Sequence, residues 1–465
     1  MLHTLDDHFH EECGVFGIYG DREAAEKTYL GLYALQHRGQ ESAGIASSDG
    51  SSIRVRKGTG LVWSVFADPD AMPPLRGIAA IGHNRYSTKG SSDLVNAQPL
   101  SIECKAGKIA VAHNGTIANS AELRRELQDL GSIFQTTSDS EIILHHIARS
   151  KKEDFLDMFK DALSKIVGSY CFVLLTPERL IAARDPYGFR PLSLGMSGDA
   201  YVVASETCAF DIIGAEYLRT VEPGEILVFD TGGVTSHRLE RAPRLSQCIF
   251  EHIYFARPDS LVFGEKVDKV RRRLGKMLAE ESPCEADIVI SVPDSGNTAA
   301  LGFARASGIK YEIGLIRNHY VGRTFIAPHQ DKRKLDVKVK LNPVRGVIED
   351  RRVVLVDDSI VRGTTMRQIV ELLRSKGARE VHVRISSPPI THPCFYGIDI
   401  STSKELIACG KCVRDIQEYL DADSLAYLST EALLKTVEDG SRYCTACFTG
   451  DYPTDVPAGY DKYGF

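Results

Sequence analysis

The feature that most constrains this chain of 465 residues is an apolar run that ends in two adjacent acids. Residues 353–356 read Val-Val-Leu-Val, Asp357 and Asp358 follow, and small and hydroxyl residues then lead into a helical pattern near Thr365. Such a continuous apolar strand is typical of a parallel sheet covered on both faces. Ligands bind at the carboxyl ends of parallel strands. An exposed strand-to-helix turn is the alternative, but adjacent acids repel each other and need a reason to be there.

The turn after this strand suits a sugar phosphate. Backbone N–H groups and a helix N-terminus bind a phosphate monoester, and two carboxylates suit ribose hydroxyls and a magnesium ion. No Walker sequence occurs. Residues 353–365 match the signature of type I phosphoribosyltransferases, and this resemblance implies phosphoribosyl pyrophosphate as substrate and Mg²⁺ as cofactor. The substrate-binding residues that it implies here are Asp357, Asp358, Ser359, Gly363, Thr364 and Thr365.

A second strand and loop agree with this interpretation. Residues 288–292 predict a strand, and Asp294, Ser295 and Gly296 follow it. By the resemblance this is the pyrophosphate loop, with Ser295 near the magnesium ion that Asp357 and Asp358 bind. The polar, basic segment 320–343, which we expect to be a mobile loop, would close over the pyrophosphate and contribute Arg323 and Lys340. A merely solvated basic loop is the alternative.

The first half of the chain centres on Cys13, which precedes a strand-like run and follows the polar residues 1–12. If the bond between Glu12 and Cys13 is cut, Cys13 gains an α-amine with a pKa of about 7.7–8.0. That amine can act as general base for its own thiol. Residues 1–12 would then be a propeptide. A small core residue on an alternating strand is the alternative.

Four further motifs favour a catalytic Cys13: residues 36–45, 82–88, 113–115 and 137–141. Together they resemble the N-terminal-nucleophile glutaminase domain of class II glutamine amidotransferases. The resemblance implies that Arg85 binds the carboxylate of glutamine, Asp139 its ammonium group, and Asn114 with Gly115 the oxyanion. An ordinary helix N-terminal acid at Asp139 and a hairpin turn at Asn114-Gly115 are the alternatives.

With both halves joined, the whole chain resembles the amidophosphoribosyltransferase family in its processed, iron–sulfur form. The resemblance implies that glutamine, water and phosphoribosyl pyrophosphate give 5-phosphoribosylamine, glutamate and pyrophosphate, the first step of purine biosynthesis. It further implies purine nucleotide inhibitors, a homotetramer and an internal ammonia channel, for which Tyr254 is a candidate; Tyr254 is equally explained as a core aromatic. A nucleotide-binding Lys-Asn-Arg-Tyr stretch of the family has His319 in its third position here, whose charge depends on pH.

The eleven cysteines are an odd number spread along the chain, which argues against a disulfide scaffold. The resemblance implies a [4Fe–4S] cluster bound by Cys248, Cys394, Cys444 and Cys447. A further pair, Cys409 and Cys412, is not part of that pattern. With Cys444 and Cys447 it could form a four-cysteine zinc site instead.

The expected fold is α+β followed by α/β. We expect a layered αββα glutaminase domain at residues 13–245, in which helical patterns at 24–36 and 138–149 interrupt short strands. A phosphoribosyltransferase domain with a mostly parallel sheet and a C-terminal cluster-binding segment is expected at residues 246–465. A net charge of −6 without a basic block does not favour nucleic acid. No run of 18 apolar residues predicts a membrane span, and residues 1–12 are not a secretory signal, so the expected location is the cytoplasm.

Two rival functions leave part of the sequence unexplained. Other class II amidotransferases, such as sugar-phosphate aminating enzymes or asparagine synthetases, do not use phosphoribosyl pyrophosphate and do not account for residues 353–365. A non-catalytic nucleotide sensor built from an inactive phosphoribosyltransferase does not account for an intact set of acids and an intact Cys13.

Overall fold

The computed structural model describes residues 13–68, 70, 72–86, 93–318, 341–399 and 402–455. Its first lobe is built on two antiparallel sheets. The seven-stranded sheet runs in the order β11 (Glu216–Thr220), β9 (Ser193–Ser197), β10 (Ala200–Ala204), β1 (Gly14–Tyr19), β4 (Ala79–Arg85), β2 (Ser42–Ser48) and β3 (Ile53–Thr59). The six-stranded sheet runs in the order β13 (Gly233–Arg238), β12 (Glu225–Asp230), β8 (Leu180–Arg184), β7 (Gly168–Leu175), β6 (Gly107–Ile117) and β5 (Leu100–Cys104).

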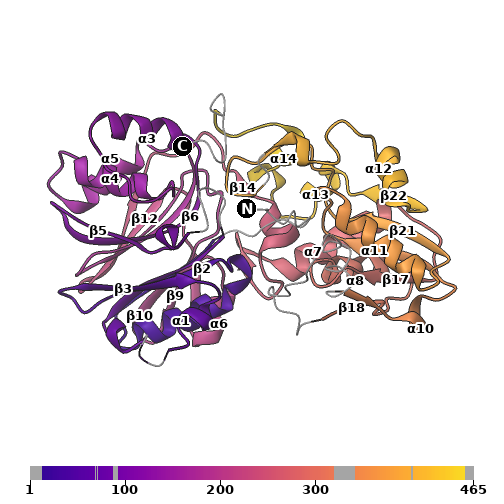
Figure 1. Cartoon of the computed structure of the whole chain (residues 1–465), viewed down its shortest axis with the longest axis horizontal. Helices are drawn as coiled ribbons and strands as arrows, with labels where there is room; N and C mark the ends of the chain where they lie inside the picture. The colour runs from indigo at the N-terminus through magenta and orange to yellow at the C-terminus, as the bar shows by residue number, and fades with distance from the viewer. Residues whose placement is uncertain are drawn as a thin grey trace.

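The two sheets pack face to face, and helices cover both outer faces (Figure 1). Alternation along the strands produces the layers: Val15 packs between the sheets, whereas the next residue, Phe16, packs under the helices. The helices over the seven-stranded sheet are α1 (Ala24–Ala34), α2 (Val62–Val65) and α6 (Cys208–Ile213). Those over the six-stranded sheet are α3 (Ser120–Asp129), α4 (Glu141–Arg149) and α5 (Phe155–Leu163). The predicted αββα glutaminase architecture is confirmed.

The sequence predicted two helices in this lobe, but the structure contains more. The predicted helices at 24–36 and 138–149 are α1 and α4, but α3 and α5 also form, on either side of α4. Both are short and amphipathic, and only one side of each is buried, through Leu123 and Leu127 in α3 and through Phe159 and Leu163 in α5. Because most of their exposed residues are charged and only a few apolar residues recur, the helical spacing of the apolar residues is not evident from the sequence.

The second lobe contains a four-stranded parallel sheet. Its order is β17 (Ile288–Ser291), β20 (Arg352–Asp357), β21 (Glu380–Ile385) and β22 (Ser424–Tyr427). Val354 and Val356 pack toward α7 (Val267–Glu281) and α8 (Asn297–Ser307), whereas Val353 and Leu355 pack toward α11 (Thr364–Ser375) and α12 (Val413–Leu420). A strand with both faces buried explains the unbroken apolar run at 353–356, as predicted.

Smaller elements complete this lobe. The parallel pair of β14 (Gln247–Cys248) with β23 (Tyr443–Cys444) brings the start of the lobe to the C-terminal segment, and the π-helical turn η4 (Glu251–Phe255) follows β14. The predicted boundary at 245/246 falls between β13 and β14. The remaining elements are β15 (Leu261–Val262), β16 (Glu265–Lys266), β18 (Leu315–Arg317), β19 (Leu341–Pro343), α10 (Arg345–Ile348), α13 (Thr430–Leu434) and α14 (Ala446–Thr449).

The expected mobile loop at 320–343 lies largely outside the described residues. At its end the expectation was wrong, because residues 341–343 form β19 and pair with β18. Across the described residues, we find no helix with the length and apolar character that crossing a membrane requires.

Candidate active sites

Cys13 lies at the beginning of β1, directly before the residues that pair with β4 on one side and β10 on the other. Its side chain is buried, with 8% of the residue exposed, and its Sγ donates to the Tyr86 carbonyl over 3.3 Å. Burial raises the pKa of the thiol to about 11, against the opposing effects of the Tyr86 hydrogen bond and the Arg85 charge. At neutral pH this thiol therefore needs a base to become a nucleophile.

Arg85 and Asp139, the two residues expected to bind glutamine, lie within electrostatic reach of Cys13. Arg85 ends β4 opposite Ser42 of β2, and the charges of both Arg85 and Asp139 reach the Cys13 thiol. Asp139 precedes α4, and its Oδ2 accepts a hydrogen bond of 2.9 Å from the Ile117 N–H. A buried cation and a buried anion near one thiol fit a zwitterionic substrate such as an α-amino acid.

Asn114 and Gly115 lie inside β6, opposite Cys171 and Tyr170 of β7. They are therefore not a hairpin turn. Gly115 has φ +142°, and a Cβ there would approach the Ser169 carbonyl oxygen to 2.2 Å, so only glycine fits. Asn114 is 1% exposed, and within the described part of the chain its Nδ2 has no hydrogen-bond partner. A buried donor without a partner suits a ligand oxygen.

A second layer of polar side chains holds this site, and sequence reasoning missed it. The Gln98 amide accepts from the His113 N–H over 2.8 Å and donates to the Ser140 hydroxyl over 3.1 Å. His113 Nδ1 lies 2.9 Å from the same hydroxyl. Burial lowers the pKa of His113, which keeps the ring neutral. These contacts tie the strand with Asn114 to the segment with Asp139; Gln98 carries no motif that could have revealed it.

The two predicted acids of the second lobe lie at the carboxyl end of β20, and both are 3% exposed. Asp357 Oδ1 accepts from the Asp358 N–H over 2.9 Å and from the Ser295 hydroxyl over 3.3 Å. The Ser359 hydroxyl donates to Asp358. Burial, together with the neighbouring Asp358 charge, raises the pKa of Asp357 well above its usual range. The structure thus brings together Ser295, both acids and Ser359, an oxygen-rich set that suits a hard cation.

Glycines let two loops close around these acids. A Cβ on Gly296 would lie 2.5 Å from the Val356 carbonyl oxygen. Gly363 has φ +80° directly before α11, so the loop 357–363 ends at a helix N-terminus formed by Thr364 and Thr365. Asp294 follows a cis peptide bond and pairs with Arg317 over 2.8 Å, with more than half of its side chain exposed. Arg323 and Lys340 lie outside the described residues.

Tyr254 lies in η4, and Arg271 of α7 binds this turn to the rest of the second lobe. The Arg271 guanidinium donates to the carbonyls of His252, Tyr254 and Ala256 over 2.8, 2.7 and 2.7 Å. Burial lowers the pKa of Arg271, and the Asp358 charge is the largest opposing effect. The turn that carries Tyr254 therefore borders the site of the two acids. Arg271 was not singled out from the sequence, where it is one of three consecutive arginines.

The four cysteines predicted to bind a cluster lie together. Cys248 and Cys444 are direct partners across the β14–β23 pair, and each thiol interacts electrostatically with Cys394. Cys447, at the start of α14, interacts with all three others. Burial is the main reason why the pKa values of Cys248, Cys444 and Cys447 are raised, that of Cys248 to about 11.

The alternative zinc site is not formed. Cys409 and Cys412 are exposed near the start of α12, whereas Cys444 and Cys447 are in or near the interior. Within the described ranges, no group of three or more His, Cys, Asp or Glu side chains is arranged to hold a metal ion, and this finding covers the four cysteines above as well as the zinc alternative.

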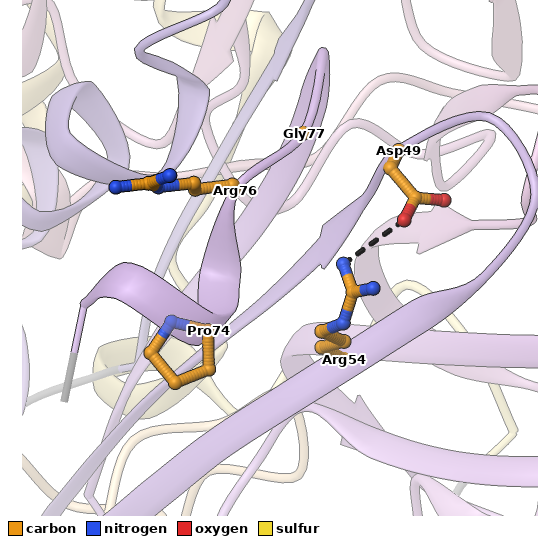
Figure 2. Close-up of a pocket in the computed structure, with 5 residues that line it drawn as sticks. All are labelled: Asp49, Arg54, Pro74, Arg76 and Gly77. Atoms are coloured by element: carbon orange, nitrogen blue, oxygen red, sulfur yellow. Dashed lines mark hydrogen bonds and ion pairs between the residues drawn. The ribbon is translucent and has the colours of Figure 1, made fainter. Parts of the chain in front are cut away.

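A pocket elsewhere on the first lobe is unrelated to these sites. It is lined by Asp49, Arg54, Pro74, Arg76 and Gly77, at the β2–β3 turn and the segment before β4 (Figure 2). Asp49 pairs with Arg54 across it at 2.9 Å and thereby balances one of its two cations.

Comparisons with known proteins agree with the division into two lobes. The family described as glutamine amidotransferase domain matches residues 83–211, and the phosphoribosyl transferase domain family matches residues 271–386. The first match contains Arg85, Asn114 and Asp139, and the second contains both acids of β20.

Relatives match over nearly the full length. The chain is 53% identical to an amidophosphoribosyltransferase of Bacillus subtilis, covering 96% of this chain and 95% of the relative. It is 52% identical to an amidophosphoribosyltransferase of Synechocystis, covering 96% and 92%. A solved glutamine phosphoribosylpyrophosphate amidotransferase of B. subtilis, complexed with ADP and GMP, superposes with a TM-score of 0.93 at 52% identity, covering 97% of this chain and all of that one.

The burial of Asp357 predicts a stability that depends on pH. Its pKa is raised in the folded state, so its contribution to stability is complete below the unfolded pKa of about 3.9 and is lost as pH rises through the folded pKa. Without divalent cations, D357N should therefore raise the Tm at pH 7, because it removes a buried charge. The Tm of the variant should also lack this part of the pH dependence.

Thermal unfolding at several pH values checks this. The control is D294N in the neighbouring loop, where a largely exposed side chain should change stability by no more than about 0.5 kcal/mol. A D357N protein that is less stable than the parent at pH 7 would contradict the assignment of Asp357 as a residue strained for ligand binding.

Proposed function

The chain belongs to the amidophosphoribosyltransferase family, and from this premise we propose which of its residues carry each half of the reaction. The protein transfers the amide nitrogen of glutamine to phosphoribosyl pyrophosphate in purine biosynthesis. The assignment of one half of the reaction to each lobe rests on two buried sites. One is the Cys13 thiol with an arginine and an aspartate near it in the first lobe, and the other is the pair of acids at the end of β20 in the second lobe.

We propose that Cys13 is the nucleophile of the glutaminase lobe. Its Sγ would attack the carboxamide carbon of glutamine while Arg85 binds the α-carboxylate and Asp139 the α-ammonium group. The negative oxygen of the tetrahedral intermediate would accept hydrogen bonds from Asn114 Nδ2 and the Gly115 N–H. The unpartnered Nδ2 supports this role, and loss of one such donor costs about 10²–10³ in rate. Ammonia leaves, and water then releases glutamate from the thioester.

A free α-amine on Cys13 would supply the base. The raised pKa of its thiol means that little thiolate exists at neutral pH, and an amine with a pKa of about 7.7–8.0 on the same residue can accept the proton. We therefore propose that residues 1–12 are removed as a propeptide.

The second lobe would bind the sugar. The α11 N-terminus at Thr364 and Thr365 suits the 5-phosphate, and Asp357 and Asp358 suit the ribose hydroxyls. The pyrophosphate would lie against Asp294, Ser295 and Gly296, and we propose that Arg323 and Lys340 also bind it.

The residues at the end of β20 also fit a magnesium ion. Asp357 and Asp358 are adjacent buried acids, and the Ser295 hydroxyl donates to Asp357. Such oxygen donors are the ligands that a hard cation prefers. Ser295, Asp357 and Asp358 would hold Mg²⁺, which would neutralise charge on the departing pyrophosphate. Ammonia from the first lobe would replace the pyrophosphate at C1 of the ribose, and Tyr254 is the candidate for lining its path.

The four cysteines fit a [4Fe–4S] cluster. Their thiols lie within electrostatic reach of one another, and four thiolates are the usual ligand set of such a cluster, so bound iron would have to offset the burial that favours the protonated thiols of Cys248, Cys444 and Cys447. Cys248, Cys394, Cys444 and Cys447 would hold the cluster, with a structural or oxygen-sensing role, because the reaction moves no electrons.

Regulation and assembly are proposed from the family. The solved relative in complex with ADP and GMP supports purine nucleotides as inhibitors of this chain. A homotetramer is proposed on the family resemblance, and a cytoplasmic location is proposed from the sequence alone; residue 319 lies outside the described residues.

Cys13 provides the direct test of the function. C13A should abolish synthesis of phosphoribosylamine from glutamine and spare synthesis from ammonium salts, because only the first lobe loses its nucleophile. Both rates can be measured as pyrophosphate release. C104A, a part-buried cysteine on β5, is the control and should keep both. Loss of both activities in C13A would refute the division between lobes.

Processing is tested by mass. Active enzyme should have an intact mass that starts at Cys13, and its glutaminase rate should rise with an apparent pKa of about 7.7–8.0. Fully active protein that still carries residues 1–12 would rule out the amine as base.

Metal content tests the cluster. Protein purified without oxygen should be brown and contain about four irons per chain. C444S should lose this iron, whereas the doubly substituted C409S/C412S should keep it, because those two thiols are exposed and apart. Zinc as the sole metal would argue against the assignment.

A further inference from the structure

Four charged side chains are buried where the two lobes meet. Three of them belong to the first lobe: Arg38, Arg190 and Glu206. The fourth, Glu251, belongs to the second lobe, and each of the four is at most 1% exposed. Glu251 begins η4, directly after β14, which lies between the lobes (Figure 1). We call these four residues the interlobe charge cluster.

The cluster is reciprocal, since each lobe contributes a carboxylate that donors of the other lobe bind. Glu251 accepts from Arg38 Nη2 over 2.8 Å and from Arg38 Nη1 over 2.9 Å, and Arg190 lies 3.6 Å away. Glu206 accepts from Ser260 Oγ over 2.7 Å and from the Arg257 N–H over 2.9 Å.

Arg38 joins this cluster to the nucleophile. Its Nε donates to the Cys13 carbonyl oxygen over 3.3 Å, and its Nη1 donates to Glu206 over 2.6 Å. Burial lowers the pKa of Arg38, but Glu251 and Glu206 more than offset this, so the side chain stays charged. One planar guanidinium therefore fixes the main chain of Cys13, a carboxylate of its own lobe and the first residue of η4.

The other end of η4 reaches the sugar site. Arg271 binds the carbonyls of His252, Tyr254 and Ala256, and the Asp358 charge acts on it. Hydrogen bonds thus link the Cys13 carbonyl through Arg38 to Glu251 and η4, and η4 to Arg271, whose guanidinium lies within reach of the Asp358 charge. Packed interiors transmit small shifts because they are stiff.

We propose that Arg38 is a positioning residue that couples the two active sites. It places Cys13 for attack only when η4 holds the position set by an occupied sugar site, so that glutamine is cleaved when its ammonia can be used. This inference rests on the proposed roles of Cys13 and Asp358. It predicts that the fork geometry of arginine matters and that charge alone is not sufficient, because lysine cannot bind a carbonyl and a carboxylate along two edges of one plane.

R38K is the test. The ratio of glutamine-dependent to ammonia-dependent synthesis should fall at least about tenfold, because displacing a reacting group by about 1 Å can cost up to a hundredfold in rate. The rise in glutamate release on adding phosphoribosyl pyrophosphate should also disappear. Ammonia-dependent synthesis and the KM for phosphoribosyl pyrophosphate should stay at parental values.

R219K is the matched control. Arg219 binds Glu225 through two hydrogen bonds of 2.7 and 2.9 Å, but both residues are in the first lobe and away from the cluster. R219K should leave unchanged both the ratio of glutamine-dependent to ammonia-dependent synthesis and the rise in glutamate release on adding phosphoribosyl pyrophosphate. Should R38K fail to fold, E251D shortens the same link without changing its charge and should shift the same two ratios.

The outcomes separate the hypotheses. If the folded R38K protein keeps the parental ratios, or if glutamine- and ammonia-dependent synthesis fall together, Arg38 has no coupling role. If the parent protein itself makes no phosphoribosylamine from glutamine, it is the proposed roles of the catalytic residues that fail.

Discussion

The arrangement of the two lobes depends on buried charges that neither lobe can satisfy alone. Each lobe has its own apolar cores, so core packing within a lobe does not fix how the lobes meet. The ion pair of Glu251 with Arg38 helps to fix how the lobes meet, because leaving one member of such a buried pair without its partner costs about 3–5 kcal/mol. An exposed pair such as Arg272 with Asp268 contributes at most about 1 kcal/mol. The buried pairs thereby select one docking geometry, and both active sites are built on the elements that this geometry brings together.

Both active sites contain groups that the fold alone would not favour. Asp357 is held beside a second acid in the interior, Asn114 keeps a buried donor without a partner in the described part of the chain, and the Cys13 thiol has a raised pKa. The buried acid pair and the unpartnered donor lower the stability of the ligand-free protein and are relieved by a cation and an oxyanion, whereas the raised pKa keeps the Cys13 thiol protonated at neutral pH. Polar groups left unsatisfied in a stable interior therefore mark the points where ligands complete the structure.

The sequence predicted what is local. Strand β20 was predicted within one residue at each end, and α11 begins one residue before the helical pattern expected near Thr365, because a continuous apolar run and the small residues before a helix act over a few positions. Cys13, Arg85, Asn114 and Asp139 were found through motifs. The sequences of α3 and α5 show no clear apolar period, and the three residues of β19 are too few to carry a pattern that distinguishes a strand from a loop. The bond between Arg38 and Glu251 could not be predicted, because 213 positions separate the two residues and nothing in either motif names the other.

The π-helical turn η4 is important because it is held between arginines that interact with two different groups of side chains. On one side lie the cysteine thiols, whose ionisation Arg190 favours at Cys248 and Cys444; on the other lie the acids of β20, balanced by Arg271. Arg190 also contacts Glu251, and Arg271 binds three carbonyls in or beside the turn. A change of charge at either centre therefore acts on the same five residues. Because arginines that feel the charges of the cysteine thiols and of Asp358 both contact η4 or its first residue, a change of charge at either place can reach Arg38 and the Cys13 main chain through this turn.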